Sequence, residues 1–498
     1  MKEFSFRSRK ESIKKMQSQK FDLLIIGGGI TGAAVARDAV MRGLKVALVE
    51  KSDFAEGTSS RSSKLAHGGF RYLENYEFKL VFEALAERTQ LLKNMPHLVK
   101  PLRFYFPVYK GDKHGRFIIN CGMWLYDILS LFRSPGLHKN FNKKRLLNDI
   151  PFLKSKGLKG GFRYYDASMW DDVLTVEIVK DAHVHGAEAA SYVEAKEPIF
   201  KEDILKGFKM KDHETDEEFD VHAKKTVVCA GPWTDLVGKS MDPEWKPWLK
   251  PSKGVHLVFD LKKIPVPGAI VMAHPDDGRI SFVIPRKDMG KGIVIVGTTD
   301  GPTPKDPNKA EVEKADVDYL MELLQRYFPE LDIKHDDILS AYVGVRPLLK
   351  GSSADLQKVS REHFIGDGPG GSVIVAGGKY TTHRTMAQEI VDYAFPKSKH
   401  SNTKLPINSN PISEHEEIES QLKFEIKNRA VIHLEDFLIR RTSHFLEHKK
   451  FDKSAIQNLA KILIEETDRP TEDVEKEIQR YQEEVNRREK WRSNIAQQ

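Results

Sequence analysis

The stretch that most constrains the fold is FDLLIIGGGITGAAVARDAVMRGLKVALVEK, which spans residues 21–51. Its apolar start suits a buried strand. A glycine turn follows, and then a helical pattern over residues 30–42 that Gly43 closes. KVALVE supplies a second apolar run. Because two adjacent parallel strands need a crossover connection, this order predicts a strand–helix–strand unit of an α/β domain.

The glycine turn of this unit fits the pattern G-x-G-x-x-G at Gly27, Gly29 and Gly32. In that pattern the first glycine permits the tight turn, the second lets the backbone approach a pyrophosphate, and the third allows close helix–strand packing. Glu50 ends the second strand, where an acidic residue accepts hydrogen bonds from an adenosine ribose. The alternative is a turn that serves only chain reversal. The context favours a dinucleotide site but does not choose between FAD and NAD.

Composition limits the classes of protein that the chain can represent. A length of 498 residues, with 40% apolar and 30% charged residues, suits a soluble globular protein of two or three domains. The formal charge of +7 favours anionic partners, such as phosphate esters or anionic lipid, without implying nucleic acid. Cys121 and Cys229 are too few for a disulfide framework or a thiolate metal site, so we expect no metal.

The rest of the chain divides by its patterning. Residues 224–233 and 371–395 read as further strands of the first sheet, whereas residues 251–345 alternate apolar and polar residues as antiparallel strands do. Val474, Ile478, Tyr481 and Val485 stand at helical spacing. We therefore expect four parts: a flexible basic extension (1–20), a discontinuous dinucleotide-binding domain (21–103, 180–250 and 340–400), an antiparallel substrate or cap domain (104–179 and 251–339) and a C-terminal helical domain (401–498).

A polar stretch shortly after the second strand, SSRSSKLAHGGFRYLENYEF at residues 59–78, has little apolar side chain to bury. It is either a solvated linker or a site whose polar groups are held for a ligand. A nicotinamide enzyme needs only its dinucleotide fold and a catalytic domain. A flavoprotein of this architecture also wraps its isoalloxazine ring with a polar segment at this place, so the stretch favours FAD.

Four motifs together resemble one family. GGGITGAA, TSSRSSKLAHGGFRYLENYEFKLVFEALAER, GVRPL and GGKYTTHR are similar to the FAD-dependent (aerobic, respiratory) glycerol-3-phosphate dehydrogenases over about residues 20–395. The resemblance implies an α/β fold: a Rossmann-like FAD-binding domain of the D-amino-acid oxidase/glutathione reductase type, an inserted antiparallel α+β substrate domain and a C-terminal helical domain. RAVIHLEDFLIRRTSHF (429–445) resembles the start of that last domain, and the segment before it is shorter than in the family.

The resemblance also implies an activity. The family oxidises sn-glycerol 3-phosphate to dihydroxyacetone phosphate and passes the electrons through FAD to membrane quinone. In an oxidase branch the electrons go to oxygen and give hydrogen peroxide. Its quinone-linked members are peripheral membrane enzymes, which implies a cytoplasmic protein at the inner face of the cell membrane. A homodimer is compatible with the family, and the sequence leaves the oligomeric state and the acceptor open.

Site residues follow from the resemblance, position by position. The flavin-contacting positions are Ser59, Ser62, Lys64, Gly378 and Thr381. The positions that line the substrate pocket are His67, Arg71 and Tyr72, and the basic positions around the substrate phosphate are Arg346, Arg361 and Lys379. Since a histidine can accept a proton near neutral pH, we assign His67 as the base, with the alternative that it only hydrogen-bonds the flavin or positions a water. Its neighbours Gly68 and Gly69 would let the substrate approach the backbone closely.

One segment raises the question of a membrane. FIINCGMWLYDILSLF (117–132) carries a single charge, Asp127, and basic residues flank it on both sides. It is too short to span a bilayer. It is either an interfacial helix held by anionic lipid or an ordinary buried helix, and the resemblance favours the first.

Two other functions remain open. An amine- or amino-acid-oxidising flavoenzyme would share the fold but would need a carboxylate clamp. A flavin- or NAD-binding sensor without catalysis would need the glycine motif but no phosphate pocket.

Overall fold

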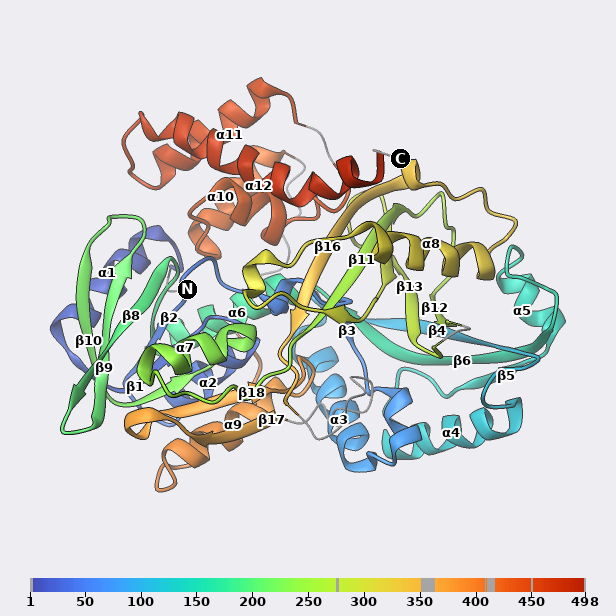
Figure 1. The fold of residues 1–498 in the computed structure, drawn as a ribbon, viewed down its shortest axis with the longest axis horizontal. Helices are drawn as coiled ribbons and strands as arrows, with labels where there is room; N and C mark the ends of the chain where they lie inside the picture. Colours follow the sequence, from blue (N-terminus) through green and yellow to red (C-terminus); the bar gives the residue numbers. More distant parts are fainter. Residues whose placement is uncertain are drawn as a thin grey trace.

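The computed structural model describes residues 3–274, 277–350, 363–407, 409, 417–448 and 451–496, so the predicted phosphate residue Arg361 lies outside the described residues. Two β-sheets form the body of the molecule, and a group of helices lies across one side of it (Figure 1). The helices are α1 (Phe6–Ser18), α2 (Ile30–Met41), α3 (Phe78–Asn94), α4 (Arg116–Leu129), α5 (Lys143–Asp149), α6 (Asp171–Val184), α7 (Thr234–Met241), α8 (Lys314–Tyr327), α9 (His383–Ala394), α10 (Ile418–Asn428), α11 (Lys453–Glu466) and α12 (Asp473–Ala496).

The first sheet contains the predicted strand–helix–strand unit. Its strands run in the order β17-β18-β10-β1-β2-β7, with β9 and β8 added beyond β10, and the pairs β18–β10, β10–β1, β1–β2 and β2–β7 are parallel. They are β1 (Lys20–Ile26), β2 (Val46–Val49), β7 (Glu188–Ala190), β8 (Val193–Lys201), β9 (Ile204–Asp212), β10 (Glu218–Val228), β17 (His363–Asp367) and β18 (Val373–Gly377). The α/β fold class is therefore confirmed.

Both faces of this sheet are covered, as a parallel sheet requires. Leu23 and Ile25 of β1 pack in one core with α2, α6 and α9. Leu24 and Ile26, on the other face, pack in a second core with Ile13 and Met16 of α1. Alternate residues of one short apolar strand thus fill two separate cores.

Helix α1 corrects the prediction of a flexible extension over residues 1–20. Ser5 caps its N-terminus in a capping box, and its apolar face is buried on the first sheet. The basic residues that suggested a solvated tail are in part paired. Arg9 is 3% exposed and binds Asp212, and Lys15 binds Glu188. The prediction was wrong because an ion pair with distant carboxylates leaves no local sequence pattern.

The second sheet is largely antiparallel, as predicted for residues 251–345, and runs in the order β15-β11-β14-β13-β12-β4-β6-β3, with β16 on β11 and β5 on β6. Its strands are β3 (Leu65–Ala66), β4 (Val99–Tyr109), β5 (Lys139–Phe141), β6 (Leu158–Met169), β11 (Ser252–Asp260), β12 (Ala269–Ala273), β13 (Ile280–Arg286), β14 (Ile293–Gly297), β15 (Gly301–Pro302) and β16 (Ile338–Arg346). Strand β16 thus joins this sheet and not the first one, and α6, predicted in part as cap domain, packs on α2 of the first.

The C-terminal helices form a small core of their own, in which Phe437 and Leu438 of a π-helix (Asp436–Arg441) pack against α10, α11 and α12. Buried ion pairs attach this domain to the first sheet domain. Asp53, in the loop after β2, accepts hydrogen bonds from Arg440 and, at 2.7 and 2.8 Å, from both terminal nitrogens of Arg441. The π-helix presents two consecutive arginines to one carboxylate.

His433 makes a second attachment between these domains. Its Nε2 lies 2.8 Å from Glu214, on the turn between β9 and β10, and its Nδ1 lies 2.7 Å from Glu477 of α12. All three side chains are largely buried. The histidine therefore stabilises the domain contact when it is protonated.

We predict that His433 makes the stability of the protein depend on pH. Burial opposes its charge, but the hydrogen bonds to Glu214 and Glu477 outweigh this and raise its pKa to about 9. Because its pKa in an unfolded chain is about 6.5, the stabilisation is complete below that pH and is lost as the pH rises through the folded value; it is on the order of 3 kcal/mol. Thermal unfolding of wild type and His433→Gln from about pH 6 to about pH 10 should show a difference in Tm that narrows at alkaline pH.

The matched control for this prediction is His400→Gln, because the His400 side chain is 82% exposed and lies outside the domain contact. That variant should follow the wild type at every pH. A His433→Gln difference that does not change with pH would contradict the assignment of the charge to His433.

Candidate active site

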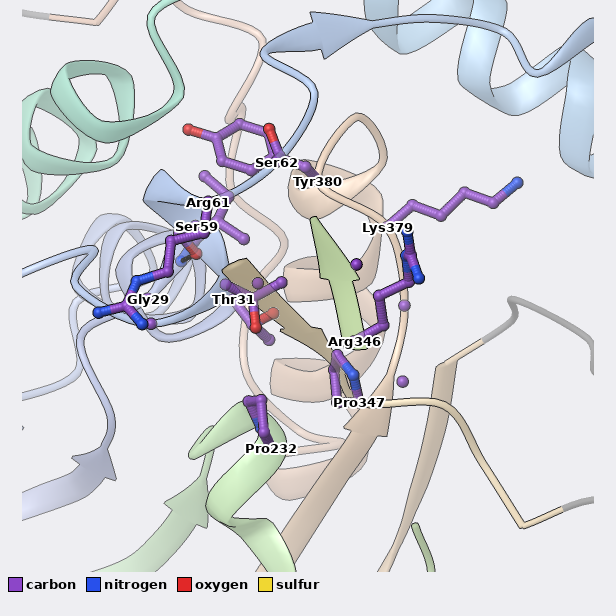
Figure 2. A pocket seen from close by; sticks show the side chains of 18 of the residues that line it. Gly29, Thr31, Ser59, Arg61, Ser62, Pro232, Arg346, Pro347, Lys379 and Tyr380 are labelled. Atoms are coloured by element: carbon purple, nitrogen blue, oxygen red, sulfur yellow. Dashed lines mark hydrogen bonds between the residues drawn. The ribbon is translucent and has the colours of Figure 1, made fainter. Parts of the chain in front are cut away.

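A cavity of about 1240 Å³ lies between the two sheets. From the first sheet domain, Gly29 and Glu50 line it, and from the second sheet His256, Phe282 and Arg346 line it. Figure 2 shows Gly29, Thr31 and Arg61 at one side of the cavity and Arg346 and Lys379 at the other. We call these sides the dinucleotide end and the cation end.

The dinucleotide end is built by the glycine turn between β1 and α2. Gly27 has a φ of +109°, and a Cβ there would lie 2.5 Å from the carbonyl oxygen of Cys229. A Cβ at Gly32 would overlap the carbonyl oxygen of Gly27, so the helix can start against the turn because both residues lack side chains. Gly29, the N-cap of α2, lines the cavity. The N-terminus of α2 thus faces the cavity, and its dipole favours an anion there.

Glu50 lies in the cavity wall at the end of β2, as the motif predicts. Its two oxygens accept hydrogen bonds from the backbone N–H groups of Gly28, at 2.7 Å, and Ser52, at 3.0 Å. Burial raises its pKa, and the two N–H groups oppose that shift. Glu50 therefore fastens the glycine turn to β2, and its role toward a ribose stays a prediction.

The serines and the lysine of the polar stretch occupy different places. Ser59 lines the cavity and its Oγ accepts from the N–H of Ile30 at 2.9 Å, next to the start of α2. Ser62 lines the cavity and donates to Asp171 at 2.6 Å. Lys64 is 1% exposed, and its ammonium is turned away to bind Asp171 and Asp172.

Lys64 therefore has a different role from the one predicted. Burial works against its charge, but the carboxylates of Asp171 and Asp172 outweigh burial and raise its pKa. The ion pair ties the polar stretch to the N-terminus of α6, and Lys64 acts on the cavity by fixing the loop and not by forming its wall.

Most of the residues predicted to bind substrate line this one cavity. His67, Arg71, Tyr72, Arg346 and Lys379 all line the cavity, and so do the predicted flavin residues Gly378 and Thr381. These residues come from the polar stretch, from β16 and from the turn between β18 and α9.

Three of these side chains hold defined positions. The ammonium of Lys379 lies 3.5 Å from the centre of the Tyr72 ring, a cation–π contact. One terminal nitrogen of Arg346 donates to Thr298 Oγ1 at 2.9 Å, and the other lies 3.3 Å from Asp300. Arg346 is thus held by several contacts while it forms part of the cavity wall.

The glycines of HGGF have a use beyond the one predicted. A Cβ at Gly68 would overlap Leu85 of α3 and the hydroxyl of Tyr126 of α4, and one at Gly69 would overlap the ring of Tyr72. The N–H of Gly68 donates to Asp166 at 3.2 Å. The two glycines therefore let α3, α4 and the Tyr72 ring close on the turn. Gly69 also lines the cavity, and the expectation that these glycines admit substrate to the backbone stays a prediction.

Sequence reasoning missed His256. It lies on β11 in the cavity wall, 2.8 Å from Ser63 Oγ, and its ring stacks on Tyr342 at 4.7 Å. Burial, together with the charges of Arg346 and Lys64, lowers its pKa to about 3, so it is neutral at physiological pH. In the sequence, His256 interrupts the otherwise apolar run VHLVF. This was the available signal for a functional residue, because a buried histidine needs a hydrogen-bond partner.

Comparisons with known proteins agree with this geometry. The family model described as FAD dependent oxidoreductase (DAO) matches residues 22–392. An aerobic glycerol-3-phosphate dehydrogenase of Staphylococcus haemolyticus is 41% identical over 385 residues, which are 77% of this chain and 68% of that protein. This chain belongs to the FAD-dependent glycerol-3-phosphate dehydrogenase family.

Two solved structures resemble this member of the glycerol-3-phosphate dehydrogenase family. The glycerol-3-phosphate dehydrogenase of Bacillus halodurans, complexed with FAD, has a TM-score of 0.79 and 27% identity, and the match covers 97% of this chain and 98% of that one. The L-α-glycerophosphate oxidase of Mycoplasma pneumoniae, with FAD bound, has a TM-score of 0.58 and 17% identity over 77% of this chain and 97% of that one. The second match shows a shared fold.

FAD is the cofactor of the glycerol-3-phosphate dehydrogenase family, and the dinucleotide end fits it. A Cβ at Gly27 or Gly32 would overlap backbone atoms at the turn, so glycine at both positions keeps the N-terminus of α2 open toward the cavity. A pyrophosphate needs this open terminus in order to approach the backbone. Cys229 also lines the cavity, and burial raises the pKa of its thiol, which stays neutral. Within the described ranges, no group of three or more His, Cys, Asp or Glu side chains is placed to hold a metal ion.

Proposed function

We propose that this protein oxidises sn-glycerol 3-phosphate to dihydroxyacetone phosphate and passes the electrons through FAD to a membrane quinone. The observation that carries the proposal is a single cavity that His67, Arg346 and Lys379 line, with the dinucleotide turn on the side opposite Arg346 and Lys379. The names of the relatives, which are glycerol-3-phosphate dehydrogenases, support the same substrate.

The cation end suits a phosphate monoester. Arg346 presents a planar guanidinium that can bind two phosphate oxygens at once, and its contacts with Thr298 and Asp300 hold it in one orientation. Lys379 adds a compact charge beside the Tyr72 ring. A substrate that places its phosphate between these two cations would direct its alcohol carbon toward the rest of the cavity.

Oxidation of the secondary alcohol requires loss of a hydride and a proton. Bound FAD supplies the acceptor for the hydride. We assign the proton to a ring nitrogen of His67, which lines the cavity in the same stretch as Arg71 and Tyr72. His256 stays neutral and can orient a hydroxyl by hydrogen bonding, because its low pKa makes it a weak base.

The surface around α3 and α4 supports a membrane as the partner. Helix α4 buries Ile119, Met123, Tyr126 and Asp127, so the one charge in the segment faces inward, where it binds His138. We define the α3/α4 apolar face by its exposed large residues, which are Tyr76, Phe78, Phe82, Phe117, Ile118, Trp124, Ile128, Leu131 and Phe132. Figure 1 shows α3 and α4 at the same side of the molecule.

The charges around this face favour an anionic surface. Exposed basic residues lie on both sides of α4: Lys110, Lys113, Arg133, Lys139, Lys143, Lys144 and Arg145. An apolar face with aromatic residues and a basic border is the pattern of an interfacial helix. In the part of the chain that the structure describes, no helix is both long and apolar enough to cross a bilayer. We propose that the protein binds the inner face of the cell membrane peripherally.

The same surface bears on the electron acceptor. The 3-10 helix Phe70–Asn75 connects the cavity to the α3/α4 apolar face: Phe70, Arg71 and Tyr72 line the cavity, and Tyr76 follows with 79% exposure. A lipid-soluble quinone that enters along this face would meet the cavity at its cation end. This short path favours quinone over oxygen as the acceptor.

The central test is the visible spectrum of the purified protein. Anaerobic addition of glycerol 3-phosphate should bleach the flavin band, and a soluble quinone should restore it at a much higher rate than air does. Rapid return of the band in air, with hydrogen peroxide as the product, would identify the oxidase instead. A flavin band that glycerol 3-phosphate leaves unchanged would contradict the proposed substrate.

Arg346→Ala should raise the apparent KM for glycerol 3-phosphate by about two orders of magnitude, because a charge-assisted contact to the phosphate is lost. The FAD content per chain, measured by absorbance, should stay at the wild-type value, since Arg346 lies at the cation end. Arg326→Ala, an exposed change on α8, is the control and should leave both values unchanged. A KM within a few-fold of wild type would show that Arg346 does not bind the phosphate.

Replacement of Phe117, Trp124 and Phe132 by Ser should weaken binding to anionic phospholipid vesicles at least tenfold, because each buried aromatic side chain contributes about 1.5–3 kcal/mol. Co-sedimentation measures this, and activity with a soluble quinone should be unchanged. The matched control replaces three exposed apolar residues of the first sheet, Phe200, Ile204 and Phe364, by Ser. Equal vesicle binding by both triple variants and the wild type would exclude the α3/α4 apolar face as the membrane contact.

A further inference from the structure

Helix α12 of the C-terminal domain forms part of the wall of the FAD cavity. Glu484 and Arg487 project from it into the cavity that the N-terminus of α2 also lines. The helical spacing of its apolar residues predicted only that this helix belongs to a C-terminal helical domain. Its place in the wall shows that the cavity draws on both sheets and on the C-terminal domain.

The residues of α12 meet the polar stretch in a small group of charges. We define the arginine cluster as Arg61, Arg487 and Arg488 together with the carboxylates of Glu56 and Glu484. Arg487 binds Glu484 through two nitrogens, at 2.7 and 2.8 Å, and Arg488 binds the same carboxylate. Arg61 lies 3.6 Å from Glu56. Three guanidinium groups thus share two carboxylates, which leaves one positive charge in excess.

Arg61 lacks part of its hydrogen bonding. Its Nε is buried and has no hydrogen-bond partner among the residues that the structure describes. Burial, followed by the nearby charges of Arg488 and Arg487, lowers its pKa to about 10, so it stays charged at neutral pH. The Arg61 side chain as a whole is 20% exposed. A partly buried charge beside like charges is stabilised by a further anion.

The position of the cluster identifies that anion. Figure 2 shows Arg61 on the side of Gly29 and Thr31, whereas Arg346 and Lys379 lie on the other side. The pyrophosphate of FAD belongs at the N-terminus of α2, and it carries two negative charges. We propose that α12 is part of the cofactor site and that Arg487, together with Arg61, binds the phosphates of FAD.

The domain contact holds Arg487 in place for this role. Asp53, eight residues before Arg61, binds Arg440 and Arg441 of the C-terminal domain. The polar stretch and the C-terminal helices are therefore fixed to each other close to the cluster. The proposal rests on FAD as the cofactor and is independent of the substrate, because it concerns the opposite end of the cavity.

The test measures binding of FAD and ADP to the apoprotein by fluorescence or calorimetric titration. Arg487→Gln and Arg61→Gln should each weaken both ligands by about tenfold to a hundredfold, the range for a charge-assisted hydrogen bond. Riboflavin, which has no phosphate, should bind each variant as it binds the wild type. Lys490→Gln is the control on the same helix, since Lys490 is exposed and pairs with Glu311.

Glu484→Gln separates phosphate binding from a merely structural ion pair. Removal of Glu484 frees Arg487 and deletes a negative charge from the wall, so ADP and FAD should bind as tightly as to the wild type or more tightly. If the Arg487–Glu484 ion pair only held α12 in place, Glu484→Gln and Arg487→Gln would weaken the binding of ADP and FAD to the same extent. That result would overturn the proposal. An Arg487→Gln variant that binds ADP with wild-type affinity would also overturn the proposal. If a Gln variant unfolds as apoprotein at the temperature of the titration, Arg487→Lys replaces it. This variant keeps the positive charge, and its affinity for ADP should lie within a few-fold of the wild-type value.

Discussion

Buried charge holds the polar segment between Asp53 and Tyr72, and the cavity depends on it. Phe54, Leu65 and Ala66 of this segment pack in the first core, but most of its other side chains are polar. Polar contacts fix it at three further points: Asp53 binds two arginines of the C-terminal domain, Asp171 binds Ser62 and Lys64, and Asp166 accepts from the N–H of Gly68. Removing one partner of such a pair leaves an unpaired buried charge, which costs about 3–5 kcal/mol. The segment that would contact flavin and substrate is thus positioned by Asp53 and Asp171, which are not part of the cavity wall, and by Asp166, which is.

The cavity separates its tasks by domain. The first sheet provides the helix terminus that suits a dinucleotide, and the second sheet provides Arg346 and His256. The polar segment runs between the two sheets and carries His67, at which flavin and substrate would meet. The alcohol carbon and the flavin that would oxidise it therefore come together only when the two sheets and the polar segment hold their relative positions. The close packing of α3, α4 and the Tyr72 ring against Gly68 and Gly69 helps to hold the segment in that position.

Local patterns predicted the parts of the fold that depend on local physics. The glycine turn, the helix after it and the antiparallel strands follow from periodicity and from steric limits at Gly27 and Gly32. The resemblance supplied the site residues, most of which line one cavity, whereas Lys64 does not. What failed depends on long-range pairing: Lys64 with Asp171, or Arg9 with Asp212, 203 residues away. Charged residues in such pairs look the same in the sequence as solvated ones.

The place of α12 in the cavity wall also bears on how the protein is made. More than 400 residues separate Gly27 from Arg487 along the chain. At a synthesis rate of about 5–20 residues per second, the ribosome delivers the helix roughly 20 to 90 s after the glycine turn. In that interval the nascent chain has its first strand–helix–strand unit but an open wall beside it. Stable capture of the flavin nucleotide is therefore a late event, set by the pace of translation and not by the folding of the glycine turn.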